Sequence, residues 1–183
     1  MKMIKKLLFL VAAVAMVACI QAKNHDNTTA DGSAAATKQQ TPQTGNIDHV
    51  PPFKIVNTDS VTITQNNLKK DKPVMIIYFA PDCGHCQHLV KSLKPVMKQL
   101  SNVQVVMITW TQLSTVKKFY KDYGLAAYPN FTLGTEGYSL NVQRYYQVKE
   151  TPYIAIYDHK GQLVKAYEKV PEIDELMTSV KKA

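Results

Sequence analysis

Cysteine is scarce in this chain, which has three in 183 residues: Cys19, Cys83 and Cys86. A framework of structural disulfides needs pairs that are spread through the sequence, whereas Cys83 and Cys86 are separated by only two residues. A structural zinc site needs four ligands, usually two such pairs, and the sequence offers one. These shortages favour a reactive role for Cys83 and Cys86 over a structural one.

Other uses of a close cysteine pair also lack the residues that they need. His85 and His88 could complete a set of two cysteines and two histidines, but they lie too close in sequence for the usual zinc-finger spacing. Covalent haem attachment needs a histidine directly after the second cysteine, where this chain has Gln87. We therefore expect neither a metal nor another cofactor at this pair.

Long runs of basic residues are missing as well. The net charge is +8, yet Lys and Arg never form a run of five or more, which argues against a nucleic-acid partner. Hydrophobic residues make up 45% of the chain and charged residues 20%, as in an ordinary globular protein. The apolar run Leu7–Ala18 is too short to span a bilayer, which takes about 20 residues.

The first residues have the pattern of an export signal. Three lysines within the first six residues precede Leu7–Ala18, which predicts a secretory signal peptide over residues 1–18. Met16-Val17-Ala18-Cys19 resembles a bacterial lipobox, so Cys19 is the candidate lipidation site and the membrane anchor. The alternative is plain signal-peptidase cleavage near Ala18 or Ala22, which would give a soluble periplasmic or secreted protein.

The segment after the signal differs from the rest in composition. Residues 19–45 are rich in Ala, Thr, Asn, Gln and Asp and carry almost no large apolar side chain after Cys19-Ile20, which predicts a flexible tether. Residues 46–183 alternate apolar strand patterns with amphipathic helix patterns. We expect strands at 53–56, 74–79, 103–108, 131–133, 153–157 and 162–168, and helices at 83–100, kinked at Pro95, 112–123, 139–146 and 171–180. This order predicts a layered α/β domain around a central mixed β-sheet flanked by helices.

Cys83-Gly84-His85-Cys86 follows the strongest strand pattern and begins a helix pattern. At a helix N-terminus the unpaired backbone amides favour a thiolate, which is the nucleophile in disulfide exchange. His85 can be cationic or donate a hydrogen bond, and it would lower the pKa of Cys83 further. Cys86 lies one turn into the helix, on the buried face. The pattern predicts Cys83 as the attacking thiol and Cys86 as the thiol that resolves a mixed disulfide.

With its strand, Cys-Gly-His-Cys turn and later Thr151-Pro152 before another strand, the sequence resembles the thioredoxin superfamily over residues 53–183. The resemblance implies a thioredoxin-like fold for residues 46–183, a cis peptide bond before Pro152, and a substrate-binding backbone edge at Thr151. The long stretch before Pro152 is similar to envelope thioredoxin-like lipoproteins of the Bacteroidetes. Ile77 departs from the family, because cytoplasmic thioredoxins carry a buried Asp at that position.

Together these patterns predict a thiol–disulfide oxidoreductase of the cell envelope, with the reductase or isomerase direction favoured. Its partners would be substrate proteins with cysteines or disulfides, an upstream electron donor or acceptor such as a membrane thiol relay, and the membrane through the lipid anchor. The alternative is a thioredoxin-like module whose two thiolates bind Cu(I) for delivery without turnover. Trp110 follows the strand at 103–108, and we expect it to be a packing residue rather than part of a substrate groove.

Overall fold

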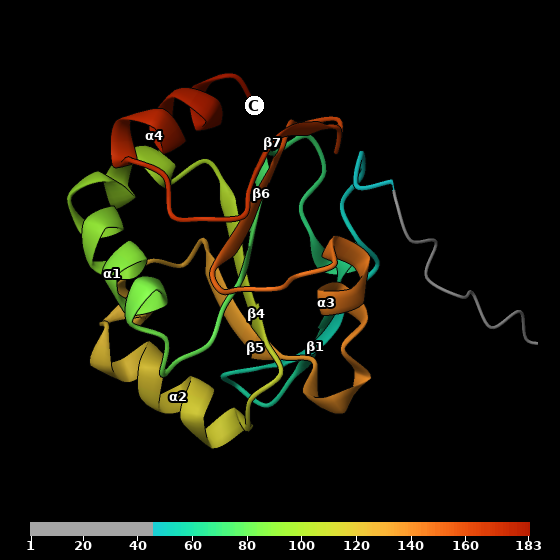
Figure 1. Cartoon of the computed structure of the whole chain (residues 1–183), viewed down its shortest axis with the longest axis vertical. Helices are drawn as coiled ribbons and strands as arrows, with labels where there is room; N and C mark the ends of the chain where they lie inside the picture. The colour runs from blue at the N-terminus through green and yellow to red at the C-terminus, as the bar shows by residue number, and fades with distance from the viewer. Residues whose placement is uncertain (1–45) are drawn as a thin grey trace, which may run out of the picture. The chain divides into compact units, whose positions relative to one another are not determined.

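The computed structural model describes residues 46–183, whose strands form one seven-stranded sheet (Figure 1). The order across the sheet is β2-β1-β5-β4-β3-β6-β7. The strands are β1 (Lys54–Asn57), β2 (Thr62–Thr64), β3 (Val74–Tyr78), β4 (Gln104–Thr109), β5 (Phe131–Thr135), β6 (Tyr153–Tyr157) and β7 (Leu163–Tyr167). The β3, β4 and β5 strands run parallel, and the other neighbours pair antiparallel, which confirms the predicted mixed sheet.

Strand β3 lies inside the sheet and explains the apolar run seen in the sequence. All five of its residues are buried, because helices cover both faces of the sheet here. Successive side chains point to opposite faces, so Met75 and Ile77 belong to one apolar cluster and Ile76 and Tyr78 to the other. The two faces of β3 are therefore packed against different sets of residues.

The helices divide between these two faces, as Figure 1 shows. One face, which includes Ile77, packs against α1 (Gly84–Leu93), α2 (Leu113–Asp122) and α4 (Ile173–Lys181). The other face, which includes Tyr78, packs against α3 (Asn141–Tyr146) through Val142 and Tyr146. Short 3-10 helices complete the chain: η1 (Gln65–Asn67), η2 (Lys94–Leu100), η3 (Leu125–Ala127) and η4 (Gly137–Ser139).

The predicted helix at 83–100 is divided in the structure. The α-helix α1 ends at Leu93, and the 3-10 helix η2 continues from Lys94 with Pro95 in its first turn. Proline has no backbone N–H and its ring blocks an α-helical hydrogen bond, so the α-helix ends before Pro95 and the segment continues as a 3-10 helix. The apolar face of α1 is buried as expected, at Cys86, Leu89, Val90 and Leu93.

Other elements also differ from the sequence prediction. Strand β5 continues to Thr135, two residues beyond the expected end, because it pairs with both β4 and β1. The small strand β2 was not expected, and it forms a hairpin with β1. The terminal helix begins at Ile173 rather than at Pro171.

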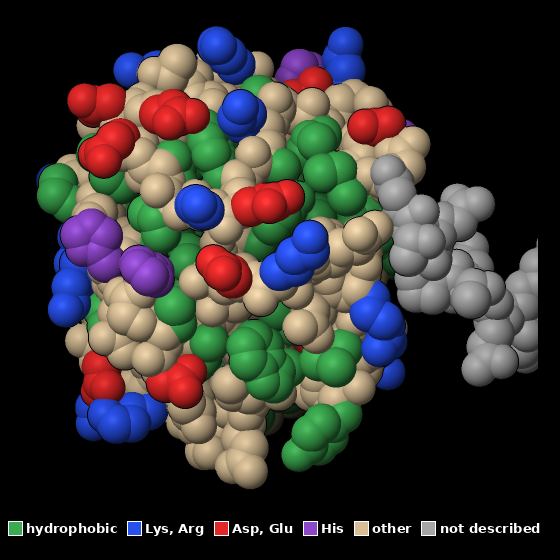
Figure 2. Space-filling model, viewed as in Figure 1, with side chains coloured by type: hydrophobic (Ala, Val, Ile, Leu, Met, Phe, Trp, Pro, Cys, Tyr) green, Lys and Arg blue, Asp and Glu red, His purple; other side chains and the backbone are tan. Residues whose placement is uncertain are grey.

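The surface drawn in Figure 2 carries basic side chains interspersed with acidic ones. No helix within residues 46–183 combines the length and the apolar character that a bilayer crossing requires. The predicted signal peptide at 1–18, the tether at 19–45 and the lipidation site Cys19 lie outside the described residues.

Candidate active site

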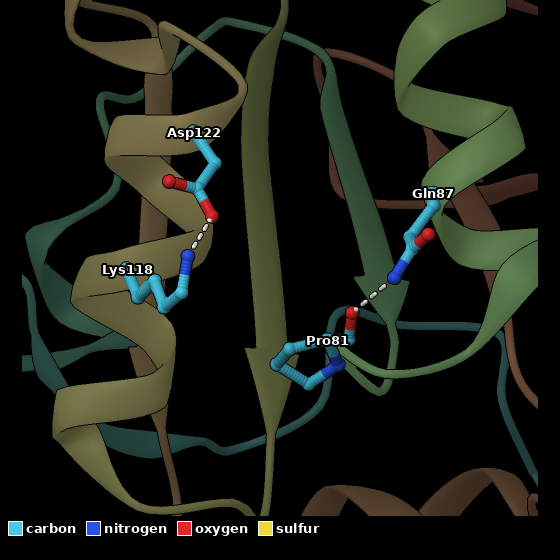
Figure 3. Close-up of polar contacts among 4 residues, drawn as sticks. All are labelled: Pro81, Gln87, Lys118 and Asp122. Carbon is cyan, nitrogen blue, oxygen red and sulfur yellow. Dashed lines mark hydrogen bonds and ion pairs between the residues drawn. The ribbon is translucent and has the colours of Figure 1, made fainter.

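The dithiol begins helix α1, directly after the loop that leaves β3. Cys83 is the N-cap residue of α1, with extended backbone angles (φ −77°, ψ 119°), and its carbonyl accepts the first helical hydrogen bond from the Gln87 N–H at 3.0 Å. The Cys83 N–H donates to Ala80 O at 3.1 Å. The Gln87 side chain donates to Pro81 O at 2.9 Å (Figure 3). This hydrogen bond joins the loop to the first turn of α1.

The two cysteines are reduced and differ in exposure. Cys83 is partly exposed, whereas Cys86 is only 1% exposed and belongs to the apolar cluster under α1. Burial raises the pKa of Cys83, but hydrogen bonds to the thiolate from the Cys86 backbone, Thr151, the Cys86 side chain and the His85 backbone outweigh it. The pKa of Cys83 therefore lies below its usual value. Burial is the main cause that raises the pKa of Cys86 to about 12.

Thr151 lies against the dithiol, although it is far from it in sequence. The Cys83 Sγ is 3.2 Å from Thr151 O, and the thiol donates a hydrogen bond to that carbonyl. The Thr151–Pro152 peptide bond is cis, as the family resemblance implies, and β6 begins directly after it. The structure therefore brings the Cys83 thiol and the backbone of Thr151 together at one end of the central strands β3 and β6.

His85 has a different surrounding from that of the two cysteines. Its side chain is exposed, and it lines a groove together with Tyr78, Trp110 and Thr151. The backbone of His85 is the part that contributes to the lowered pKa of Cys83. A further influence of the imidazole on the dithiol stays a prediction.

The described residues include no group of three or more His, Cys, Asp or Glu side chains that is placed to bind a metal ion. At the dithiol, the sulfur atoms of Cys83 and Cys86 are the soft atoms that could bind a metal ion. A metal held there would therefore have two thiolate ligands.

Residues 61–145 match the family model described as thioredoxin, and this segment contains the dithiol, β3 and α1. This segment of the chain carries a thioredoxin family domain. This thioredoxin-like chain is 28% identical over 75 residues to a probable protein disulfide-isomerase A6 of Medicago sativa, covering 39% of this chain and 21% of that protein. It is 35% identical over 71 residues to the chloroplastic thioredoxin Y1 of Arabidopsis thaliana, covering 38% of this chain and 40% of that one. The matched segments thus span well under half of these curated relatives.

The fold of the thioredoxin-like domain extends beyond the segment that the family model matches. A secreted disulfide oxidoreductase of Mycobacterium tuberculosis, described as homologous to E. coli DsbE, superposes with a TM-score of 0.60. The alignment covers 72% of this chain and 96% of that one at 21% sequence identity. At that identity the likeness concerns the fold, and it confirms the thioredoxin fold predicted from the sequence.

The thioredoxin-like domain places Ile77 where the sequence comparison expects an acid. Ile77 is fully buried and lies in the same apolar cluster as Cys86. A buried acid is nevertheless present on the other face of the sheet, where Glu136 is 8% exposed. Its carboxylate accepts hydrogen bonds from the Tyr78 hydroxyl at 2.8 Å, from the Val142 N–H at 2.8 Å and from the Gln143 N–H at 3.3 Å.

Sequence reasoning missed Glu136. It follows β5 and precedes α3, so an acidic residue close to a helix start was the available signal. Sequence reasoning also assigned Trp110 to packing alone. Trp110 does stack on Tyr78, with ring centroids 5.8 Å apart and planes at 18°, but it is 37% exposed and lines the groove beside His85.

Proposed function

We propose that this chain is a thiol–disulfide oxidoreductase that acts on protein disulfides in the cell envelope. The observation that supports this most directly is the contrast between the two thiols of one helical turn. Cys83 is accessible with a lowered pKa, and Cys86 is buried with a pKa raised to about 12. An accessible thiolate attacks, whereas a buried thiol is kept from outside reagents and reacts with a sulfur that is brought to it.

In the reductive direction, the Cys83 thiolate attacks one sulfur of a substrate disulfide. A bond forms between Cys83 and that sulfur, the substrate S–S bond breaks, and the other substrate sulfur leaves as a thiolate that takes up a proton. Cys86 then loses its proton and attacks the Cys83 sulfur. This second step forms the Cys83–Cys86 disulfide and releases the substrate's second sulfur as a thiol. A dithiol donor returns the two electrons.

We propose that Thr151 orients the substrate of the mixed disulfide through its backbone. In the reduced protein the Cys83 thiol donates to Thr151 O at 3.2 Å. Once Cys83 is joined to a substrate it has no proton to donate, so the carbonyl is free to accept an N–H from an extended substrate segment. Such pairing with a backbone edge is how extended peptides add to a sheet, and Pro152 follows this edge in the chain.

The test is reduction of insulin disulfides by the full chain with a dithiol reductant. We expect Cys83→Ser to abolish the rate enhancement and Cys86→Ser to accumulate a mixed disulfide, because the release step is blocked. Cys19→Ser is the matched control, since it replaces a cysteine that the mechanism does not use. An unchanged rate in Cys83→Ser would overturn the proposal.

The direction of electron flow is proposed as reductive or isomerising. A reduction potential between about −270 and −180 mV, the range from thioredoxin to protein disulfide isomerase, supports this direction. The measurement is the equilibrium of the Cys83–Cys86 pair with glutathione or dithiothreitol buffers. A potential near about −120 mV would instead identify an oxidant.

The Cu(I) alternative requires both sulfurs to lose their protons, because thiolates are the metal ligands. Burial, which raises the pKa of Cys86 to about 12, adds to the free energy that a metal would have to supply to displace that proton. Titration of the reduced chain with Cu(I) against a chromogenic chelator separates the two functions. A tight stoichiometric complex in a chain that shows no insulin reduction would favour the metal module over the enzyme.

The envelope location is proposed from residues 1–18 and Cys19, with residues 19–45 as the tether. It is supported by the fold shared with a disulfide oxidoreductase that is described as secreted. Expression in a bacterial host followed by fractionation tests it. We expect the chain in the membrane fraction with a labelled lipid attached, and Cys19→Ala in the soluble fraction without the label. Equal fractionation of the two forms would contradict the lipid anchor.

A further inference from the structure

A groove of about 420 Å³ lies beside the dithiol on the side of α3. Its lining includes Tyr78, His85, Trp110, Gln143 and Thr151. Two of these residues tie the groove to the candidate active site: His85 belongs to the Cys-Gly-His-Cys turn, and Thr151 O lies 3.2 Å from the Cys83 Sγ. A ligand in this groove is therefore next to any chain that is joined to Cys83.

Trp110 is the distinctive side chain of this groove. It is 37% exposed, and among the described residues it is one of three large hydrophobic side chains that are exposed. Its ring stacks on Tyr78, which is fully buried and whose hydroxyl is held by Glu136 at 2.8 Å. The Trp110 indole therefore packs against Tyr78 while more than a third of its surface is exposed. We call this exposed aromatic surface of Trp110 the platform, because an apolar or aromatic group can stack on it.

Glu136 also connects the two sides of the groove. It accepts hydrogen bonds from Tyr78, which supports the Trp110 side, and from the backbone N–H groups of Val142 and Gln143 in the first turn of α3. Gln143 itself lines the groove. Glu136 is therefore a positioning residue that sets the spacing between the platform and α3.

The charges around the groove do not favour a ligand of one sign. Lys149 and Glu150 both line it and both are exposed. Their opposite charges leave the aromatic surface as the main basis of recognition. An acidic or a basic peptide would gain at one of these side chains what it loses at the other.

We propose that this groove binds a large apolar or aromatic side chain of the substrate protein, close in sequence to the cysteine that Cys83 attacks. The inference rests on the proposed function and adds the class of substrate. An extended segment advances about 3.3 Å per residue, so residues one to three positions from a cysteine joined to Cys83 extend about 3 to 10 Å away from it. Thr151 contacts Cys83 and lines the same groove as Trp110, so such a residue lies beside this groove. Unfolded or partly folded proteins expose such cysteines beside aromatic residues.

The first test compares two peptides with one interchain disulfide each, identical except for Phe or Ser two residues from the cysteine. We expect the full chain to reduce the Phe peptide with a kcat/KM about three to ten times higher, which is the range for one aromatic contact. In Trp110→Ala the ratio should fall close to one. Tyr138→Ala is the matched control: its side chain is 95% exposed and outside the groove lining, and it should keep the wild-type ratio.

A second measurement does not depend on turnover. Trp110 is the single tryptophan of the sequence, so its fluorescence reports on this groove directly. In Cys86→Ser, Cys83 can be joined to each peptide through an activated disulfide of the peptide. We expect a change in Trp110 emission with the Phe peptide that is absent with the Ser peptide.

The outcomes separate the two proposals. Equal kcat/KM for the two peptides in a chain that reduces both would overturn the groove inference and leave the proposed function intact. If the Cys83→Ser variant matches the wild-type rate on both peptides, the proposed function fails. Identical Trp110 emission with the Phe and Ser peptides would overturn the groove inference whether or not turnover is observed.

Discussion

The Tyr78 hydroxyl donates a hydrogen bond to the Glu136 carboxylate across 2.8 Å, on the face of the sheet that α3 covers. Ile77, the preceding residue, points to the opposite face and shares an apolar cluster with Cys86. The buried acid of this domain is therefore separated from Cys86 by the sheet. Its contacts fix Tyr78 and the start of α3 rather than the second thiol. The proton that Cys86 must lose in the resolving step has no acceptor at position 77.

Replacement of Glu136 by alanine should destabilise the fold. The buried Tyr78 hydroxyl and the Val142 N–H would lose their acceptor, and each buried group left unpaired costs about 1 to 3 kcal/mol. We expect the free energy of unfolding to fall by about 2 to 4 kcal/mol in urea denaturation. Tyr78→Phe should cost less, because Glu136 keeps its two backbone donors. Glu168→Ala, at an exposed glutamate, is the control and should lie within about 0.5 kcal/mol of the wild type.

Alkylation should distinguish the two thiols. Because the pKa of Cys83 lies below its usual value, its reaction with iodoacetamide should reach half of its maximal rate at a lower pH than that of an unperturbed thiol. Cys86 should stay unmodified near neutral pH, since it is buried and its pKa is about 12. Mass spectrometry of the reduced chain after proteolysis locates the label. Preferential labelling of Cys86 would contradict the assignment of Cys83 as the attacking thiol.

The raised pKa of Cys86 should also make the reduced protein less stable in alkali. Above about pH 8.5 the unfolded chain releases the Cys86 proton, whereas the folded chain keeps it until about pH 12. The unfolded state then binds fewer protons, so stability falls as pH rises through this window. Cys83 has the opposite shift, and its contribution is complete once the pH exceeds its unfolded pKa.

Urea unfolding of the reduced chain at pH 8.5 and pH 9.5 measures this effect. We expect Cys86→Ala to lose about 1 kcal/mol less than the wild type over this interval, because the variant has no thiol to ionise at this position. The buried tyrosines affect both proteins alike, since their raised pKa values give them the same sign of pH dependence. Parallel losses in the two proteins would show that Cys86 ionises as readily in the folded state as in the unfolded one.

The parts of the fold that the sequence predicts well are those with local patterns. The run from Val74 to Phe79 predicts a strand buried on both faces because no polar residue interrupts it, and the spacing of apolar residues after Cys83 predicts the buried face of α1. The position of Thr151 beside Cys83 came from the family resemblance, since 68 residues separate the two in the chain.

Glu136 and Trp110 could not be assigned from the sequence for a related reason. The partner of Glu136, Tyr78, lies 58 residues earlier, and a single glutamate after a short strand has the pattern of a turn residue. Trp110 lies at the end of β4, and its exposure depends on where α3 and the segment before Pro152 pack. Neither contact has a periodic signature, so only the assembled sheet shows them.

Gly134 marks a close approach between strands that no larger residue fits. A Cβ atom at Gly134 in β5 would lie 2.8 Å from Val56 O and 2.8 Å from the Ile55 Cδ1 in β1. Because the backbone oxygen belongs to a paired strand, it cannot move aside without disturbing the β1–β5 ladder. We expect Gly134→Ala to lower the free energy of unfolding by about 1 to 3 kcal/mol, the usual cost of overpacking.

Gly84→Ala is the matched substitution, because a Cβ atom at Gly84 would meet no other atom within 4 Å. Gly84 is the first residue of α1, where alanine restricts the unfolded chain and favours the helix. We expect this variant to be as stable as the wild type or up to about 1 kcal/mol more stable, as measured by urea unfolding under the same conditions. Equal effects of the two substitutions would mean that β1 does not approach β5 as closely as the structure places it, because the same methyl group is added in both variants.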